Sequence, residues 1–149
     1  MKTSQLMKLF EDQLKNIFWS EKALTKAITF MIKNATSIDL IEALLFHLEK
    51  TNKQVERLVK IFADINKKPV VIKCEVMEGL IKVAREITKY CELGAMSEAS
   101  IISASQKEEH YKIVTYVTLH QFAKKLGLIE VAELLKKPYK KKKPLTINF

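Results

Sequence analysis

Residues 10–28 read FEDQLKNIFWSEKALTKAI, and this stretch decides the fold. Its apolar residues recur at alternating steps of three and four, which is the spacing of one face of an α-helix. The stripe consists of Phe10, Leu14, Ile17, Glu21, Leu24 and Ile28. We therefore predict one long helix from Ser4 to Asn34, with Thr3 or Ser4 as its N-cap.

The same pattern continues through most of the chain. We predict four more helices: Ile38–Asn66 after a Thr36 or Ser37 cap, Cys74–Leu93 with Gly94 as its stop, Ser97–Leu126 ended by Gly127, and a short one over 128–137. On the helix over 38–66 the predicted inward residues are Leu40, Leu44, His47, Thr51, Gln54, Leu58, Ile61 and Ile65. On the helix over 74–93 they are Met77, Leu80, Ala84, Ile87 and Cys91. On the helix over 97–126 they are Ile102, Gln106, Glu109, Ile113, Tyr116, His120 and Ala123.

Composition supports an all-α fold. The 149 residues fit one domain, and only 3 Gly and 3 Pro are available for the many turns that β-sandwiches and barrels need. Helices of about 30 residues span roughly 45 Å. Joined by short connections, such helices must pack antiparallel. We expect a helical bundle over residues 1–137 and a lysine-rich tail over 138–149.

No targeting or membrane-spanning segment is visible, so we expect a soluble, cytoplasmic protein. Cys74 and Cys91 lie 17 residues apart in one predicted helix, too far for a disulfide, and should be free thiols. Six lysines in 136–143 supply most of the net charge of +9. A tail of this kind either keeps the protein in solution or holds nucleic acid or another anionic surface.

Several polar residues fall on the predicted apolar stripes. Glu21 lies on the first stripe, His47, Thr51 and Gln54 on the second, and Glu109 on the fourth. A buried carboxylate must be paired, protonated or bound to a cation, and facing carboxylates are how helical bundles build metal sites. Each residue also has an ordinary structural explanation, because a Glu can reach the rim of a stripe and a His can be hydrogen-bonded in the core.

Four segments resemble a known family. They are Leu9-Phe10 to Leu24, the run His47-Leu-Glu-Lys-Thr51 with its continuation to Leu58, Cys74-Glu-Val-Met-Glu-Gly-Leu80, and Glu109-His-Tyr-Lys-Ile113 with Tyr116. In this order and spacing they are similar to the YciE/YciF family of ferritin-like, stress-associated proteins, over about Leu6 to Leu135. The resemblance implies a ferritin-like antiparallel four-helix bundle with an additional short helix in the crossover, and a homodimer.

The resemblance also implies a carboxylate-rich site for one or two iron ions. Glu21, Gln54, Glu109 and His110 match its metal-site positions, and His47, Thr51 and Tyr116 are candidates to surround them. This chain departs from the family pattern where Lys50 and Lys112 stand in place of acids. Pro138 also ends the last helix before an acidic segment that the family has and this chain lacks.

These departures lead to three hypotheses. In the first, the metal site has degenerated: the Lys112 ammonium reaches Glu109 or Glu21, a protein cation replaces the metal, and no cofactor is bound. In the second, the chain is an iron-binding oxidoreductase or peroxide scavenger that uses Glu21, Gln54, Glu109 and His110. In the third, Lys136–Lys143 binds anionic surfaces.

Overall fold

The computed structural model describes residues 1–139, and over these it consists of helices and connecting loops without a strand. The helices are α1 (Thr3–Asn34), α2 (Ile38–Asp64), α3 (Glu75–Tyr90), α4 (Ala95–Lys125) and α5 (Ile129–Lys136), followed by a 3₁₀ turn, η1 (Lys137–Tyr139). The all-α prediction is confirmed. Within the described residues no helix is both long and apolar enough to cross a membrane.

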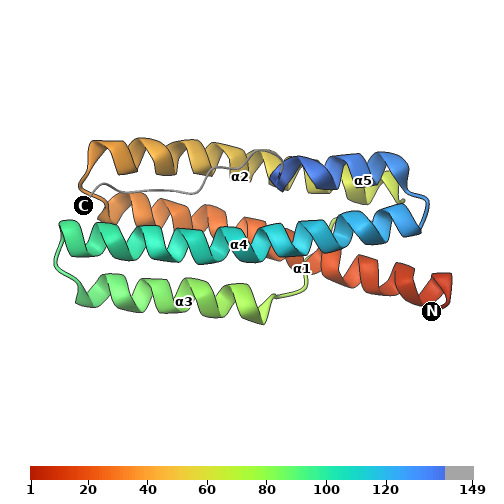
Figure 1. Cartoon of the computed structure of the whole chain (residues 1–149), viewed down its shortest axis with the longest axis horizontal. Helices are drawn as coiled ribbons and strands as arrows, with labels where there is room; N and C mark the ends of the chain where they lie inside the picture. Colours follow the sequence, from red (N-terminus) through yellow and green to blue (C-terminus); the bar gives the residue numbers. More distant parts are fainter. Residues whose placement is uncertain (140–149) are drawn as a thin grey trace.

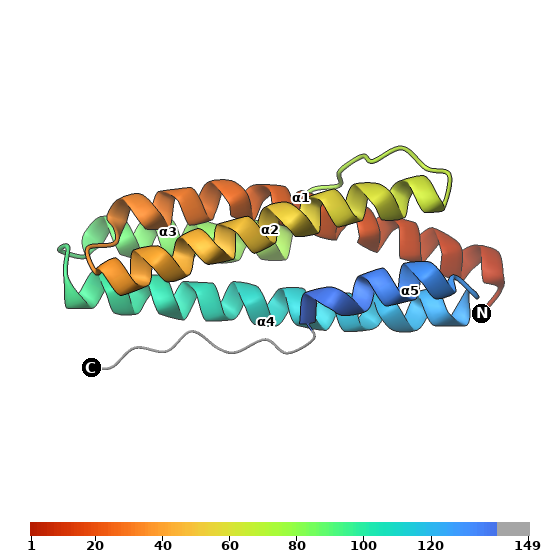
Figure 2. The same ribbon diagram turned by 90° about the horizontal axis from the view of Figure 1, so that it is seen from above.

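The three long helices form the body of the bundle. α1 and α2 pack against each other as an antiparallel pair, and α4 runs lengthwise beside them and packs against α1 (Figures 1 and 2). The short helices lie on opposite sides of α4: α3 packs against α4 and α1, whereas α5 packs against α4 and α2. α3 lies along one end of α4, and the shorter α5 lies along the other end (Figure 1).

This arrangement produces two separate apolar clusters. The α5-side cluster includes Phe10, Phe18, Phe62 and Leu135, and the α3-side cluster includes Leu24, Ile28, Leu44, Met77 and Ile101. The boundary between them on α1 falls between Phe18 and Leu24, where Ser20 and Glu21 are fully buried. The middle of the bundle is therefore polar.

Several predicted helix ends differ from the structure. Lys2, not Thr3 or Ser4, is the N-cap of α1, and α2 ends at Asp64. Gly94 is not the stop of α3, which ends at Tyr90; it is the N-cap of α4, and its N–H donates to Ser97 Oγ at 3.1 Å. The backbone can enter α4 from Gly94 because its φ of +131° carries no side-chain penalty.

At the C-terminal side of the bundle, α4 ends at Lys125 and α5 at Lys136. Gly127, with φ +76°, ends α4 as predicted, because glycine adopts the left-handed conformation of a helix stop without strain. Pro138 is buried and Tyr139 packs on the α5-side cluster. The division of the chain at residue 137 into a bundle and a tail stays a prediction. The rest of the predicted tail lies outside the described residues.

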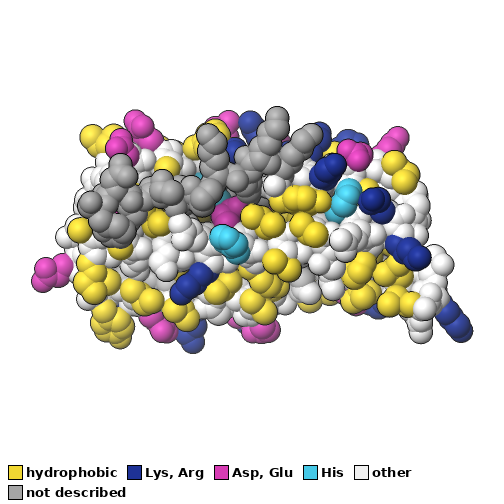
Figure 3. Space-filling model, viewed as in Figure 1, with side chains coloured by type: hydrophobic (Ala, Val, Ile, Leu, Met, Phe, Trp, Pro, Cys, Tyr) yellow, Lys and Arg dark blue, Asp and Glu magenta, His cyan; other side chains and the backbone are white. Residues whose placement is uncertain are grey.

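The face that α3 buries also differs from the prediction. Its buried residues are Met77, Ile81, Ala84 and Thr88, whereas Ile87 is 46% exposed, so placing Ile87 inward was wrong. Apolar side chains gather on the surface over α3 (Figure 3). They include Val76, Val83, Ile87 and Tyr90.

Candidate functional site

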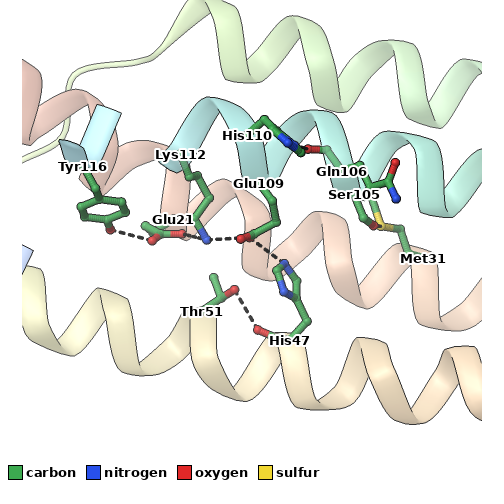
Figure 4. Close-up of polar contacts among 10 residues, drawn as sticks. All are labelled: Glu21, Met31, His47, Thr51, Ser105, Gln106, Glu109, His110, Lys112 and Tyr116. Atoms are coloured by element: carbon green, nitrogen blue, oxygen red, sulfur yellow. Dashed lines mark hydrogen bonds and ion pairs between the residues drawn. The ribbon is translucent and has the colours of Figure 1, made fainter. Parts of the chain in front are cut away.

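Three charged side chains meet at the middle of the bundle, between the two apolar clusters. The Nζ of Lys112 lies 2.8 Å from Oε1 of Glu21 and 3.1 Å from Oε1 of Glu109 (Figure 4). Lys112 is 1% exposed and Glu21 is 0% exposed. We call these three side chains, together with Tyr116 and His47, which contact them, the central polar layer.

Two further side chains complete this layer. The hydroxyl of Tyr116 donates to Oε2 of Glu21 at 2.6 Å, so both oxygens of that carboxylate have a partner. His47 of α2 places Nε2 3.1 Å from Oε1 of Glu109. The layer therefore joins α1, α2 and α4 through one chain of polar contacts (Figure 4).

The ammonium of Lys112 is held in its charged form. Burial by itself lowers the pKa of this group, but attraction to Glu21 and then to Glu109 outweighs burial and raises the pKa above the ordinary 10.5. Burial raises the pKa of Tyr116 well above 10, and the neighbouring Glu21 charge raises it further. The layer thus contains a fixed cation, two carboxylates and a neutral phenol that donates.

Of the other residues that the sequence singled out, two are buried and two are exposed. Thr51 is buried and donates to the backbone oxygen of His47, and Gln54 is buried with its Oε1 unpartnered. His110 does not join the layer: it is exposed, and its Nδ1 contacts the backbone oxygen of Gln106 at 2.7 Å. Lys50 is exposed as well, with its Nζ 4.5 Å from the centre of the Phe46 ring.

The buried face of α4 is rotated relative to the predicted stripe. Its central buried residues are Ser105, Glu108, Lys112, Tyr116 and Leu119. The predicted inward residues Gln106, Glu109, Ile113 and His120 are half-buried instead. A stripe that passes through Ser105, Glu108 and Lys112 is hard to recognise in the sequence, because it carries polar residues where a core face is expected to be apolar.

This rotation buries a carboxyl that the sequence reasoning missed. Glu108 is 2% exposed, and its Oε1 has no hydrogen-bond partner. Burial raises the pKa of Glu108 to about 8, although the Lys112 charge acts in the opposite direction. Glu108 is therefore protonated at neutral pH. The spacing of four residues to Lys112 was the only signal in the sequence that could have pointed to it.

A second missed carboxylate lies at the end of the bundle. Glu98 of α4 accepts hydrogen bonds from the backbone N–H and the hydroxyl of Thr36 and from the N–H of Ser37. Burial opposes its ionisation, but these hydrogen bonds outweigh burial and lower the pKa of Glu98 below 4.5. Glu98 thereby fixes the turn between α1 and α2 to the start of α4.

The central polar layer does not fit a metal ion. The position between Glu21 and Glu109 is taken by the ammonium of Lys112. Among residues 1–139 no group of three or more His, Cys, Asp or Glu side chains could hold a metal. A di-iron centre needs several anionic oxygens to offset its charge, and the layer supplies two carboxylates that already share a cation.

Comparisons with known proteins agree on one family. The model of a domain of unknown function, DUF892, matches residues 5–144. Protein YciF of Escherichia coli K12 is 36% identical over 147 residues, covering 95% of this chain and 89% of YciF. The crystal structure of the E. coli stress protein YciF matches with a TM-score of 0.85 at 35% identity, covering 89% of this chain and 84% of that one. YcfI from Rhodopseudomonas palustris gives the same values.

Proposed function

The chain belongs to the DUF892 family, and on that premise we propose that it is a stress-associated, ferritin-like bundle protein whose central site holds a lysine in place of a metal. The observation that carries this proposal is the position of Lys112 Nζ, within 3.1 Å of carboxylates from two helices and 1% exposed. The proposed role of the layer is structural, not catalytic.

The charge balance supports this assignment. Two carboxylates in an apolar interior would repel each other strongly, and an ammonium between them removes that repulsion without any bound ion. The contacts to Tyr116 and His47 satisfy further oxygen lone pairs, as a buried network requires. A reactive metal centre also needs an open coordination position, and here the amine fills the space between the carboxylates.

The alternative, an iron-binding oxidoreductase, requires Lys112 to leave this position. Its proposed ligand set also includes His110, whose ring lies on the exposed side of α4. The proposed stress association comes from the relative YciF, which is described as a stress protein. A homodimer and a cytoplasmic location stay predictions, as does binding of anionic surfaces through Lys136–Lys143.

A charge-reversal variant tests the proposal. Lys112→Glu removes the internal cation and places an acid where the family pattern has one. We expect this variant to be less stable than the parent in the presence of a chelator, because three carboxyls would crowd one buried layer. Anaerobic Fe²⁺ or Mn²⁺ should raise its melting temperature and bind stoichiometrically. The parent should show neither effect.

The control is Lys50→Glu, which restores the other family acid at an exposed position. Its melting temperature should not respond to either metal. Stoichiometric iron in the parent after anaerobic reconstitution, with an oxo-bridge absorption band in air, would favour the oxidoreductase and reject the structural role.

A further inference from the structure

A groove between α1 and α3 carries a concentration of positive charge that the central polar layer does not explain. Its volume is about 800 Å³, which lies within the range of small-molecule sites. Lys22 and Lys26 line it from α1, and Lys82, Arg85 and Lys89 line it from α3. Both helices thus contribute cations to the lining of the groove.

Most of this charge has no anionic partner within the described part of the chain. Of the two acids that line the groove, Glu78 is already bound by Lys73 at 2.6 Å, which leaves Glu86. No ion pair is formed by Lys22, Lys26, Lys82, Arg85 or Lys89 in residues 1–139. Like charges that line one groove disfavour one another, and an anion bound among them relieves that cost.

The floor of the groove is apolar and aromatic. Trp19, Ala23 and Ile81 line it, and Val71 closes it from the loop between α2 and α3. That loop is fixed to α1, because the N–H of Ile72 donates to the backbone oxygen of Lys15 at 3.3 Å. Trp19 is half-buried, and an indole in the lining of a cationic groove is a side chain on which a planar ring can stack.

Two of the cations are held in place by aromatic rings. The guanidinium of Arg85 lies 5.4 Å from the centre of the Phe30 ring, and Lys22 Nζ lies 4.5 Å from the centre of the Phe18 ring. Such contacts leave the cation charged, and neither ring is among the residues that line the groove. Arg85 is one of only two arginines in the chain, and its planar fork matches the oxygens of a phosphate.

We propose that the groove between α1 and α3 is a binding site for a nucleoside polyphosphate, with the ring on Trp19 and the phosphates among the cations of both helices. The cations suit a ligand with several negative charges, and the apolar floor suits an aromatic ring. A bare polyphosphate uses only the first feature and a nucleoside only the second. The site is separate from the central polar layer and does not depend on its function.

Trp19 allows a direct test, because it is the single tryptophan of the chain. Its fluorescence, excited beyond the absorption of the base, should change saturably when ADP or ATP is added to the full-length protein without a divalent metal. Tripolyphosphate should compete with ATP, and adenosine should bind more weakly than either nucleotide. The change should weaken as salt is raised, because the contacts are ionic.

A double variant locates the site. Lys26→Gln with Lys82→Gln removes one cation from each side and should raise the dissociation constant about tenfold or more, the loss expected for two charge-assisted contacts. The matched control, Lys124→Gln with Lys125→Gln, removes the same charge from two exposed positions outside the groove lining and should change it less than about twofold.

Three outcomes would overturn the proposal. The first is a Trp19 fluorescence change that does not saturate by about 1 mM nucleotide, because the affinity would then be too weak for a specific binding site. The second is an equal loss of affinity in the control, which would mean that binding follows net charge alone. The third is quenching by a single-stranded oligonucleotide without any response to a mononucleotide, which would identify a nucleic-acid surface instead.

Discussion

The middle of the bundle and the turn between α1 and α2 both bury a glutamate, but they neutralise it differently. In the middle, Glu21 is met by the side chains of Lys112 and Tyr116. At the turn, Glu98 is met by the N–H groups of Thr36 and Ser37. Backbone N–H groups are free only at the start of a helix, whereas inside a helix they are bonded to the preceding turn.

A third glutamate shows what happens when neither solution is available. Glu108 lies near the middle of α4, and it has neither a free N–H nor a direct contact with Lys112. It remains in the interior by keeping its proton, with a pKa raised to about 8 by burial. The groups within reach of each carboxyl thus decide the outcome: Glu21 is ion-paired, Glu98 accepts backbone hydrogen bonds, and Glu108 keeps its proton.

The largest effect should come from breaking the central pair. Lys112→Ala should lower the free energy of unfolding by about 3–5 kcal/mol, because Glu21 would be left buried without its cation. Urea unfolding followed by circular dichroism measures this. The surface control, Lys8→Ala, breaks an exposed pair with Asp12 and should leave the free energy of unfolding nearly unchanged, because water and salt screen that pair.

A double variant separates lost pairing from lost packing. Lys112→Met with Glu21→Gln removes both charges at similar volume and should recover much of the stability that Lys112→Met alone loses. A loss in Lys112→Ala that is no larger than in Lys8→Ala would show that the layer does not hold the bundle together.

The next effect concerns Glu108 and appears only with pH. Its folded pKa lies above its unfolded value, so the folded state binds the extra proton and stability falls as pH rises from about 4.5 to about 8. Glu108→Gln keeps a neutral side chain at every pH. It should match the parent near pH 5 and exceed it at pH 9 by on the order of 3 kcal/mol.

Thermal unfolding of both proteins at several pH values checks this. The exposed Glu42→Gln serves as the control, and its difference from the parent should not change with pH. If the stability difference between Glu108→Gln and the parent also does not change with pH, then Glu108 is ionised in the folded protein, and the prediction that it keeps its proton is refuted.

The smallest of the three effects should come from the turn. Glu98→Ala removes the acceptor for the N–H groups of Thr36 and Ser37 and should cost about 1–3 kcal/mol, less than the central pair because water can replace it at a helix end. The lowered pKa of Glu98 gives the pH dependence: this contribution is present above pH 4.5 and is lost as pH falls through the folded pKa.

Amide hydrogen exchange makes the third prediction specific. Exchange should accelerate at Thr36 and Ser37 in Glu98→Ala, while the amides around Lys112 in α4 should keep their protection. Uniform acceleration along α4 would instead mean that the two regions unfold together and that their local stabilities do not differ.

The sequence by itself determined the helices, their order and the presence of acids on apolar stripes. Long periodic runs such as residues 10–28 specify a helix and its buried face without further information, because apolar spacing and helix geometry are both local. Glu21 was found in this way, since it interrupts an otherwise apolar stripe. Lys112 was singled out as a departure from the family pattern, with Glu109 or Glu21 as its expected partner; in the structure its Nζ lies within 3.1 Å of an oxygen of each.

Only the tertiary structure decided the rotation of α4 and the consequences of that rotation. Its buried face passes through Ser105, Glu108 and Lys112, and polar residues give the helix no apolar stripe from which this orientation could be read. The orientation of α4 about its own axis depends instead on its packing against neighbouring helices, which include α1 and α3. That orientation buries Glu108, leaves His110 exposed, and places the Lys112 ammonium between Glu21 and Glu109.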